Sequence, residues 1–116
     1  MNEITTKIIT SKLLEEDAGL IDLIDKFMLR LPVLYDSIIK AFAEKDWPGF
    51  LGLVHQMKGV GGGYGYPMLT TLCAEIELTA KAEDFIKLTR QMEEFSLMKD
   101  AILAGADENH RIVERS

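Results

Sequence analysis

Apolar residues recur at intervals of three and four along most of this 116-residue chain, which is the spacing of an amphipathic helix. The longest run spans residues 20–42, and its apolar positions are Leu20, Ile24, Phe27, Leu31, Leu34, Ile38 and Phe42. Pro32 lies inside this run. Because the apolar positions stay in phase on both sides of Pro32, we predict one long helix with a kink rather than a break.

Capping residues and turn residues delimit three further helices. Asp46 can cap a second long helix with Pro48 in its first turn, and Gly65 suits the left-handed position that follows its end. Pro67 can start a third helix, and Gly105 can end a fourth. The apolar positions of the third and fourth helices are Leu69, Leu72, Cys73, Ile76 and Ala80, then Phe85, Leu88, Met92, Phe95 and Ile102.

A shorter helix precedes the long ones, with Thr10 or Ser11 as its cap and Gly19 as its end. No segment alternates apolar and polar residues for long enough to predict a strand. Long helices joined by turns of a few residues pack antiparallel. The sequence therefore predicts an all-α fold, an antiparallel up-and-down four-helix bundle with a short extra N-terminal helix.

We expect residues 1–116 to form a single domain, with a core over about residues 10–105 and a polar C-terminal tail, 106–116, that frays. The chain is 47% hydrophobic and 28% charged, an ordinary globular composition. Its net charge of −6, without a cluster of Lys and Arg, argues against nucleic acid as a partner. No apolar stretch reaches the roughly 20 residues that span a bilayer, and the start of the chain lacks a signal pattern. We therefore expect a cytoplasmic protein with no membrane partner.

The second long helix holds the candidate chemistry. Residues turn by about 100° each along a helix, so its predicted apolar face consists of Phe50, Leu53, Met57, Val60 and Tyr64. The opposite face, predicted to be exposed, consists of His55, Lys58, Gly59 and Gly62. The glycines at positions 59, 61, 62 and 63 together oppose helix formation by roughly 3–4 kcal/mol. We expect the outward glycines to leave the surface around the imidazole bare for a partner, and the inward-facing Gly61 to allow close helix packing.

Apolar residues near the histidine are candidates for the same docking surface. Leu51 falls on the outward side of the helix beside His55, where an exposed apolar side chain often belongs to an interaction site. Further candidates from the neighbouring helix are Leu20, Ile21, Phe27 and Met28.

An exposed histidine beside a lysine suits phosphoryl chemistry. Neutral imidazole is nucleophilic at nitrogen, and an ammonium one turn away can stabilise the oxygens of a phosphoryl group in transfer. The sequence contains no GxxxxGK[ST] loop for ATP, no Ser/His/Asp set and no cluster of metal ligands. We therefore expect a phosphate carrier rather than a self-sufficient enzyme. It would have no kinase activity and no cofactor of its own, and the partner would supply Mg²⁺ and a carboxylate.

The same residues resemble the signature of histidine-containing phosphotransfer (HPt) domains, over roughly residues 20–102. The sequence His55-Gln56-Met57-Lys58-Gly59, followed by Gly65, has the form H-x-x-K-G-x-x-x-x-x-G. The segment Leu72-Cys73-Ala74-Glu75-Ile76-Glu77 resembles the L-C-x-x-[LI]-E sequence of the next helix. Domains of this family are four-helix bundles that relay phosphate between the aspartates of receiver domains in two-component signalling.

The resemblance implies roles for three residues. His55 would be phosphorylated, Lys58 would stabilise the phosphoryl group, and Glu77 would orient the imidazole through its other ring nitrogen. It also implies receiver domains of hybrid histidine kinases and response regulators as partners. The chain departs from the family at Gly63, where relatives often carry Asn or Ser, so a capping contact made there in relatives is not expected here.

Other functions fit part of the pattern. A non-catalytic helical adaptor would bind a receiver or a partner helix through the glycine-floored groove without phosphotransfer. A small metal-binding protein is disfavoured, because one exposed histidine and the cysteine Cys73, expected in the core, do not make a coordination sphere. The second histidine, His110, stands alone in the polar tail. The glycine run does not predict a dinucleotide loop, because the residues before it are helical.

Overall fold

The computed structural model of the chain describes residues 7–115. Over this range the fold is all-α, as the periodicity predicted, without a strand. The elements are α1 (Leu13–Glu16), the 3₁₀ helix η1 (Ala18–Leu20), α2 (Ile21–Ala43), α3 (Trp47–Gly63), α4 (Pro67–Lys81), α5 (Phe85–Ala104) and α6 (Ala106–Arg115). α2 continues through Pro32 without a break. The short helix expected to end at Gly19 is divided into α1 and η1.

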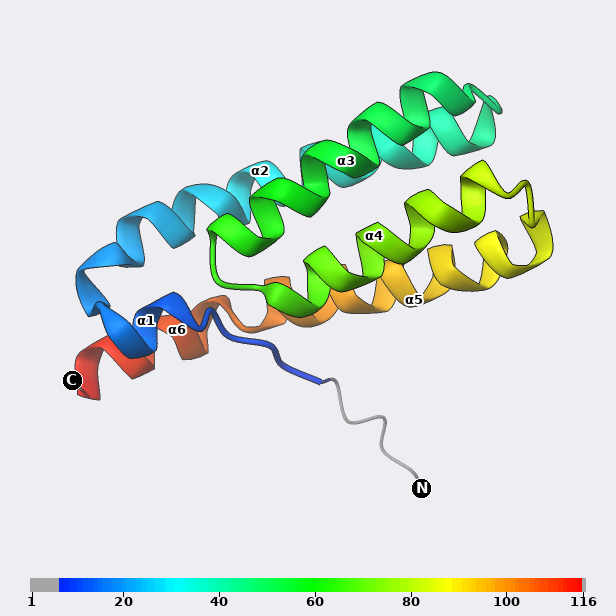
Figure 1. Cartoon of the computed structure of the whole chain (residues 1–116). Helices are drawn as coiled ribbons and strands as arrows, with labels where there is room; N and C mark the ends of the chain where they lie inside the picture. The colour runs from blue at the N-terminus through cyan, green and yellow to red at the C-terminus, as the bar shows by residue number, and fades with distance from the viewer. Residues whose placement is uncertain (1–6, 116) are drawn as a thin grey trace.

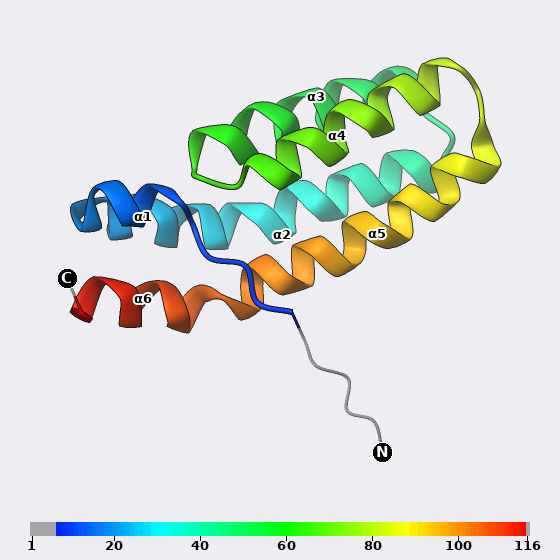
Figure 2. The ribbon, with the colours of Figure 1, turned by 60° about the horizontal axis from the view of Figure 1, so that its bottom comes forward.

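The long helices α2 to α5 lie side by side, and each runs in the opposite direction to the one before it (Figure 1, Figure 2). α3 contacts both α2 and α4, and α5 contacts both α4 and α2, so these helices surround a common core. Fully buried side chains from each helix fill it, and they include Phe27, Phe50, Ile76 and Phe95, together with Tyr66 from the turn before α4. Burying one such side chain stabilises the fold by about 1.5–3 kcal/mol, before the cost of ordering the chain.

The turns before and after α3 use the residues that the sequence indicated. The Asp46 side chain accepts a hydrogen bond from the Gly49 backbone N–H (3.1 Å), and Pro48 occupies the first turn. Gly65, between α3 and α4, has a φ of +89°, a left-handed conformation that favours glycine. A Cβ at Gly65 would also collide with the Ser11 hydroxyl, so the chain packs too closely here for any side chain.

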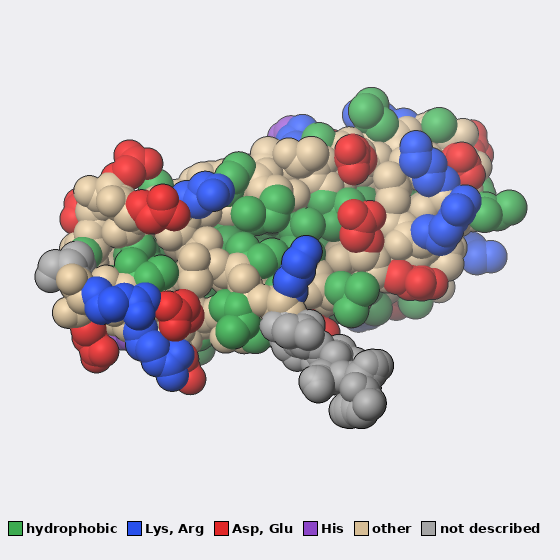
Figure 3. Space-filling model, turned by 90° about the horizontal axis from the view of Figure 1, so that it is seen from below, with side chains coloured by type: hydrophobic (Ala, Val, Ile, Leu, Met, Phe, Trp, Pro, Cys, Tyr) green, Lys and Arg blue, Asp and Glu red, His purple; other side chains and the backbone are tan. Residues whose placement is uncertain are grey.

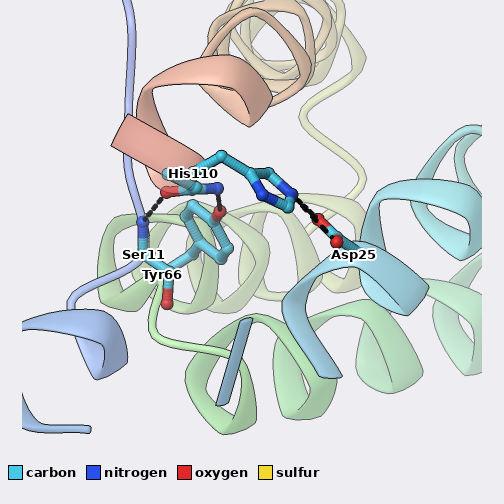
Figure 4. Close-up of polar contacts among 5 residues, drawn as sticks. Ser11, Asp25, Tyr66 and His110 are labelled. Carbon is cyan, nitrogen blue, oxygen red and sulfur yellow. Dashed lines mark hydrogen bonds and ion pairs between the residues drawn. The ribbon is translucent and has the colours of Figure 1, made fainter. Parts of the chain in front are cut away.

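Residues 106–115 of the C-terminal tail are helical, and the expectation that the tail frays is wrong for this part of the chain. It forms α6, which contacts α1, η1 and α2. Asn109 is fully buried; its Oδ1 accepts a hydrogen bond from the Ser11 backbone N–H (3.0 Å), and its Nδ2 donates to the Tyr66 hydroxyl (3.3 Å; Figure 4). His110 does not stand alone, because its Nε2 lies 2.9 Å from Asp25 of α2. These long-range polar contacts hold a segment whose composition alone suggests an unattached end.

The segment before α1 connects α6 to the turn between α3 and α4. The buried Ser11 donates from Oγ to the Tyr64 carbonyl (2.6 Å) and accepts from the Leu13 N–H (3.2 Å). The Lys12 N–H donates to the Gly65 carbonyl (2.9 Å). Carbonyls at the end of a helix lack partners within it. The N-terminal segment supplies donors at the end of α3 and so holds its glycine-rich last turns in place.

Charged side chains of both signs are interspersed on the face shown in Figure 3, and they do not form a single basic patch there. Within the described part of the chain, no helix combines the length and the apolar character needed to cross a membrane. Several large apolar side chains are strongly exposed, and none of them belongs to α3; the most exposed are Leu29, Val33, Leu78, Ile86 and Leu97.

Candidate functional site

α3 turns one face to the core and the opposite face to solvent. The residues buried on its core side are Phe50, Val54, Met57 and Gly61. The other residues predicted for this face, Leu53, Val60 and Tyr64, are half-buried at its edges. The buried face is therefore rotated slightly from the predicted one. The rotation brings Val54, an apolar residue that the predicted face did not include, fully into the core.

His55 projects from the exposed face of α3, as the helical phase predicted, with 70% of its side chain accessible. Its Nδ1 lies 3.4 Å from Oε2 of Glu77 on α4. A carboxylate at Nδ1 favours the tautomer that carries its proton there and leaves the lone pair on Nε2. Since the two nitrogens lie on different edges of the ring, the contact with α4 leaves the Nε2 edge directed away from Glu77.

Glu77 joins the histidine to the lysine. Its side chain is only 11% accessible, and its Oε1 lies 2.7 Å from the Nζ of Lys58. Burial by itself raises the pKa of the Glu77 carboxyl, but the hydrogen bonds and charges of Lys58 and then of His55 outweigh burial. The pKa therefore lies below its ordinary value of 4.5, and the carboxylate is ionised at neutral pH. It can accept hydrogen bonds from both neighbours.

The site thus consists of an exposed imidazole, a partly exposed ammonium and a nearly buried carboxylate. Lys58 is 31% accessible and lies one turn beyond His55 on the same surface of α3. This set offers a nucleophile with a cation beside it. Among residues 7–115, no group of three or more His, Cys, Asp or Glu side chains could hold a metal ion.

Part of the surface around His55 is free of side chains. A Cβ added at Gly52, Gly59 or Gly63 would meet no other atom within 4 Å. These positions recur at intervals of seven and four residues, so they share one outward line along α3. Gly59 is bare as predicted, and the backbone of α3 is accessible one turn from the imidazole.

The other two glycines of the run face α4. A Cβ at Gly61 would lie 3.1 Å from side-chain atoms of Leu69, and one at Gly62 would lie 3.1 Å from the Thr70 Oγ1. Gly61 therefore allows close packing, as expected. Gly62 is exposed but not bare, which corrects the sequence interpretation. The helical phase placed it outward correctly, but only the packed structure shows how closely α4 approaches.

The apolar docking candidates are half-buried or buried in the structure. Leu51 is half-buried and packs against the core cluster, so only part of its surface is available beside His55. Phe27 is not a surface residue: it is 1% exposed and stacks on Tyr64, with ring centroids 4.9 Å apart. Leu20, Ile21 and Met28 are half-buried.

Cys73 is buried, as its position on the apolar stripe predicted. Burial and then the charge of Glu77 raise the pKa of its thiol to about 12, against a smaller opposing effect of Lys58. A thiol with so high a pKa stays protonated at neutral pH and is a poor nucleophile. The cysteine is therefore a packing residue one turn from Glu77.

Sequence reasoning missed one residue at this site. Thr70 of α4 donates a hydrogen bond from Oγ1 to the backbone carbonyl of Lys58 (2.7 Å). Thr70 and Glu77 are seven residues apart, which is about two helical turns, so both can reach α3 from the same side of α4. The spacing is visible in the sequence. Nothing there indicates that the hydroxyl crosses to α3 instead of bonding within α4.

A comparison with protein families agrees with this geometry. The model of the Hpt domain matches residues 22–105, which extend from the start of α2 to the end of α5. The chain therefore belongs to the Hpt domain family, and this membership indicates a role in the phosphorelays of two-component signalling. Comparison with curated proteins and with solved structures gave no significant match.

Proposed function

We propose that this protein is a phosphorelay intermediate in which His55 carries the phosphoryl group. The lone pair on Nε2 attacks the phosphorus of an aspartyl phosphate in a receiver domain, the P–O bond to that aspartate breaks, and the carboxylate leaves. The reverse chemistry then passes the group to the aspartate of a second receiver. The observation that supports this most directly is an imidazole 70% exposed and held by Glu77 at Nδ1.

Glu77 and Lys58 have separate roles in this proposal. The ionised Glu77 accepts the Nδ1–H and stabilises the positive charge that the ring acquires as Nε2 bonds to phosphorus. Lys58, now 2.7 Å from Glu77, is within one turn of the imidazole and can turn toward the phosphoryl oxygens. Phosphoryl transfer requires mainly positioning and charge stabilisation, which these two side chains can provide.

The partner supplies what this chain lacks. Receivers of hybrid histidine kinases and response regulators would bring the aspartate and the Mg²⁺, and we place the reaction in the cytoplasm. A receiver would approach the surface formed by the bare Gly59, the exposed Gly62 and the exposed part of Leu51. The antiparallel order of α2 to α5 is consistent with the up-and-down four-helix bundle that such a domain uses to present its histidine.

The test uses a receiver labelled with radioactive phosphate and incubated with this protein. We expect acid-labile, base-stable label on the wild type and none on His55→Ala. His110→Ala is the matched control, because the chain has two histidines and this one lies in α6. Equal labelling of His55→Ala would refute the mechanism. Receiver binding without label on any variant would favour the adaptor function instead.

A second measurement locates the phosphate on the ring. Nuclear magnetic resonance of the phosphorylated protein distinguishes phosphate on Nε2 from phosphate on Nδ1. We expect Nε2, because Nδ1 faces Glu77 at 3.4 Å. Phosphate on Nδ1 would contradict the role proposed for the carboxylate while leaving His55 as the acceptor.

A further inference from the structure

Thr70 makes an interhelical hydrogen bond that Thr71, Thr79 and Thr89 do not make. The hydroxyls of Thr71, Thr79 and Thr89 each donate to the carbonyl four residues earlier in their own helix. This is the usual bond of a helical threonine. The Thr70 hydroxyl instead crosses from α4 to α3 and donates to the Lys58 carbonyl at 2.7 Å.

The bond lies where α4 packs against the glycine-rich part of α3. A Cβ at Gly62 would lie 3.1 Å from the Thr70 Oγ1, so a side chain at position 62 would crowd the hydroxyl. In an α-helix the carbonyl of Lys58 is also the acceptor for the Gly62 N–H. The Thr70 hydrogen bond therefore constrains the helical turn between Lys58 and Gly62.

α4 consequently holds Lys58 at two points. Thr70 binds its backbone carbonyl at 2.7 Å, and Glu77, two turns further along α4, binds its ammonium at 2.7 Å. Glycines contribute little helix propensity and few packing contacts. The position of this part of α3 against α4 therefore depends on these two specific contacts. A leucine-rich turn would depend on them less, because its side chains would also pack against α4.

We propose that Thr70 is a positioning residue for phosphotransfer, and this inference rests on the function proposed above. Its hydroxyl sets the register of α3 against α4 so that the Glu77 carboxylate meets both His55 Nδ1 and Lys58 Nζ. Thr70 does not itself contact the phosphoryl group. Its loss lets the Lys58 turn shift along α4, which weakens the contacts of Glu77 with both side chains.

The test compares Thr70→Val, which keeps the shape and removes the hydroxyl, with Thr70→Ser, which restores it. Thr71→Val is the matched control, because the neighbouring threonine bonds only to Pro67 of its own helix. Phosphotransfer from a labelled receiver is measured as a function of receiver concentration. We expect kcat to fall about three- to tenfold in Thr70→Val, the size of effect that one hydrogen bond can have, with KM unchanged.

Thr70→Ser and Thr71→Val should transfer phosphate at close to the wild-type rate. The imidazole ¹⁵N shifts of His55 give an independent readout that a general loss of stability would not move. In Thr70→Val they should show a smaller fraction of the Nδ1–H tautomer.

A Thr70→Val rate equal to that of Thr71→Val, or unchanged imidazole shifts, would overturn the inference. So would a Thr70→Ser variant as slow as Thr70→Val. If the wild type itself takes up no label, the failure belongs to the proposed function and not to Thr70.

Discussion

Replacing Gly59 with alanine should make the protein more stable and the phosphotransfer slower. Gly59 lies in the interior of α3, and a Cβ there would meet no atom within 4 Å, so the new methyl group causes no collision in the folded state. Alanine favours a helix over glycine by about 0.8–1.0 kcal/mol, partly because it restricts the unfolded chain. With a urea dependence of about 2 kcal/mol/M, the unfolding midpoint should rise by roughly 0.5 M.

The same methyl group should obstruct a receiver. It would stand one turn from His55 on the surface that the proposed function requires to be bare, and a displacement of about 1 Å at the reacting atoms can cost on the order of a hundredfold in rate. We expect phosphotransfer to slow by about tenfold or more, measured with a labelled receiver under single-turnover conditions.

Two other glycines of α3 serve as controls for stability. Gly52→Ala should give a similar increase, because that position is equally open and also lies inside the helix. Gly61→Ala should give no increase or a loss, because its methyl group would lie 3.1 Å from Leu69. A Gly59→Ala protein no more stable than the wild type would refute the packing argument. A more stable protein with an unchanged rate would show that the bare surface does not serve the partner.

Two further predictions concern the carboxylate and the terminal helix. The pKa of Glu77 is depressed in the folded state, so its contribution is complete above its ordinary value of 4.5 and is lost as pH falls through the lower folded value. Glu77→Gln should therefore have a lower free energy of unfolding in urea than the wild type at pH 7. The difference between the two proteins should be smaller at pH 3, and an equal difference at both pH values would contradict this reasoning. Asn109→Ala should cost about 2 kcal/mol, because it leaves the buried Ser11 N–H without its acceptor. His110→Ala, which removes an exposed side-chain contact with Asp25, should cost less than about 1 kcal/mol. A larger loss from it than from Asn109→Ala would refute this account of α6.

Much of the fold could be predicted because helix formation follows local rules. The three-and-four spacing of apolar residues identified the long helices, and their ends were marked by residues such as Asp46 and Gly65, whose roles depend on the backbone nearby. The tail was misjudged for the complementary reason. α6 is held by Asn109, whose partner Ser11 is 98 residues away, and no local pattern reveals such a contact.

The candidate site divides in the same way. The exposure of His55 and its nearness to Lys58 follow from the helical period alone. The Glu77 contact was implied by resemblance and allowed by the helical phase, but its distances depend on how α4 packs on α3. Thr70 could not be identified at all, because the hydroxyl of a helical threonine ordinarily bonds within its own helix.

The sequence by itself determined which residues form the four long helices, where most of these helices end and that one histidine faces solvent, since each of these depends on neighbours within a few residues along the chain. The tertiary structure decided that a single carboxylate meets both the imidazole and the ammonium, and that two of the glycines lie against α4 while the others lie open. These features depend on the separation and register of two packed helices. Helix spacing and register arise from all the side chains between the helices together, so no single stretch of sequence specifies them.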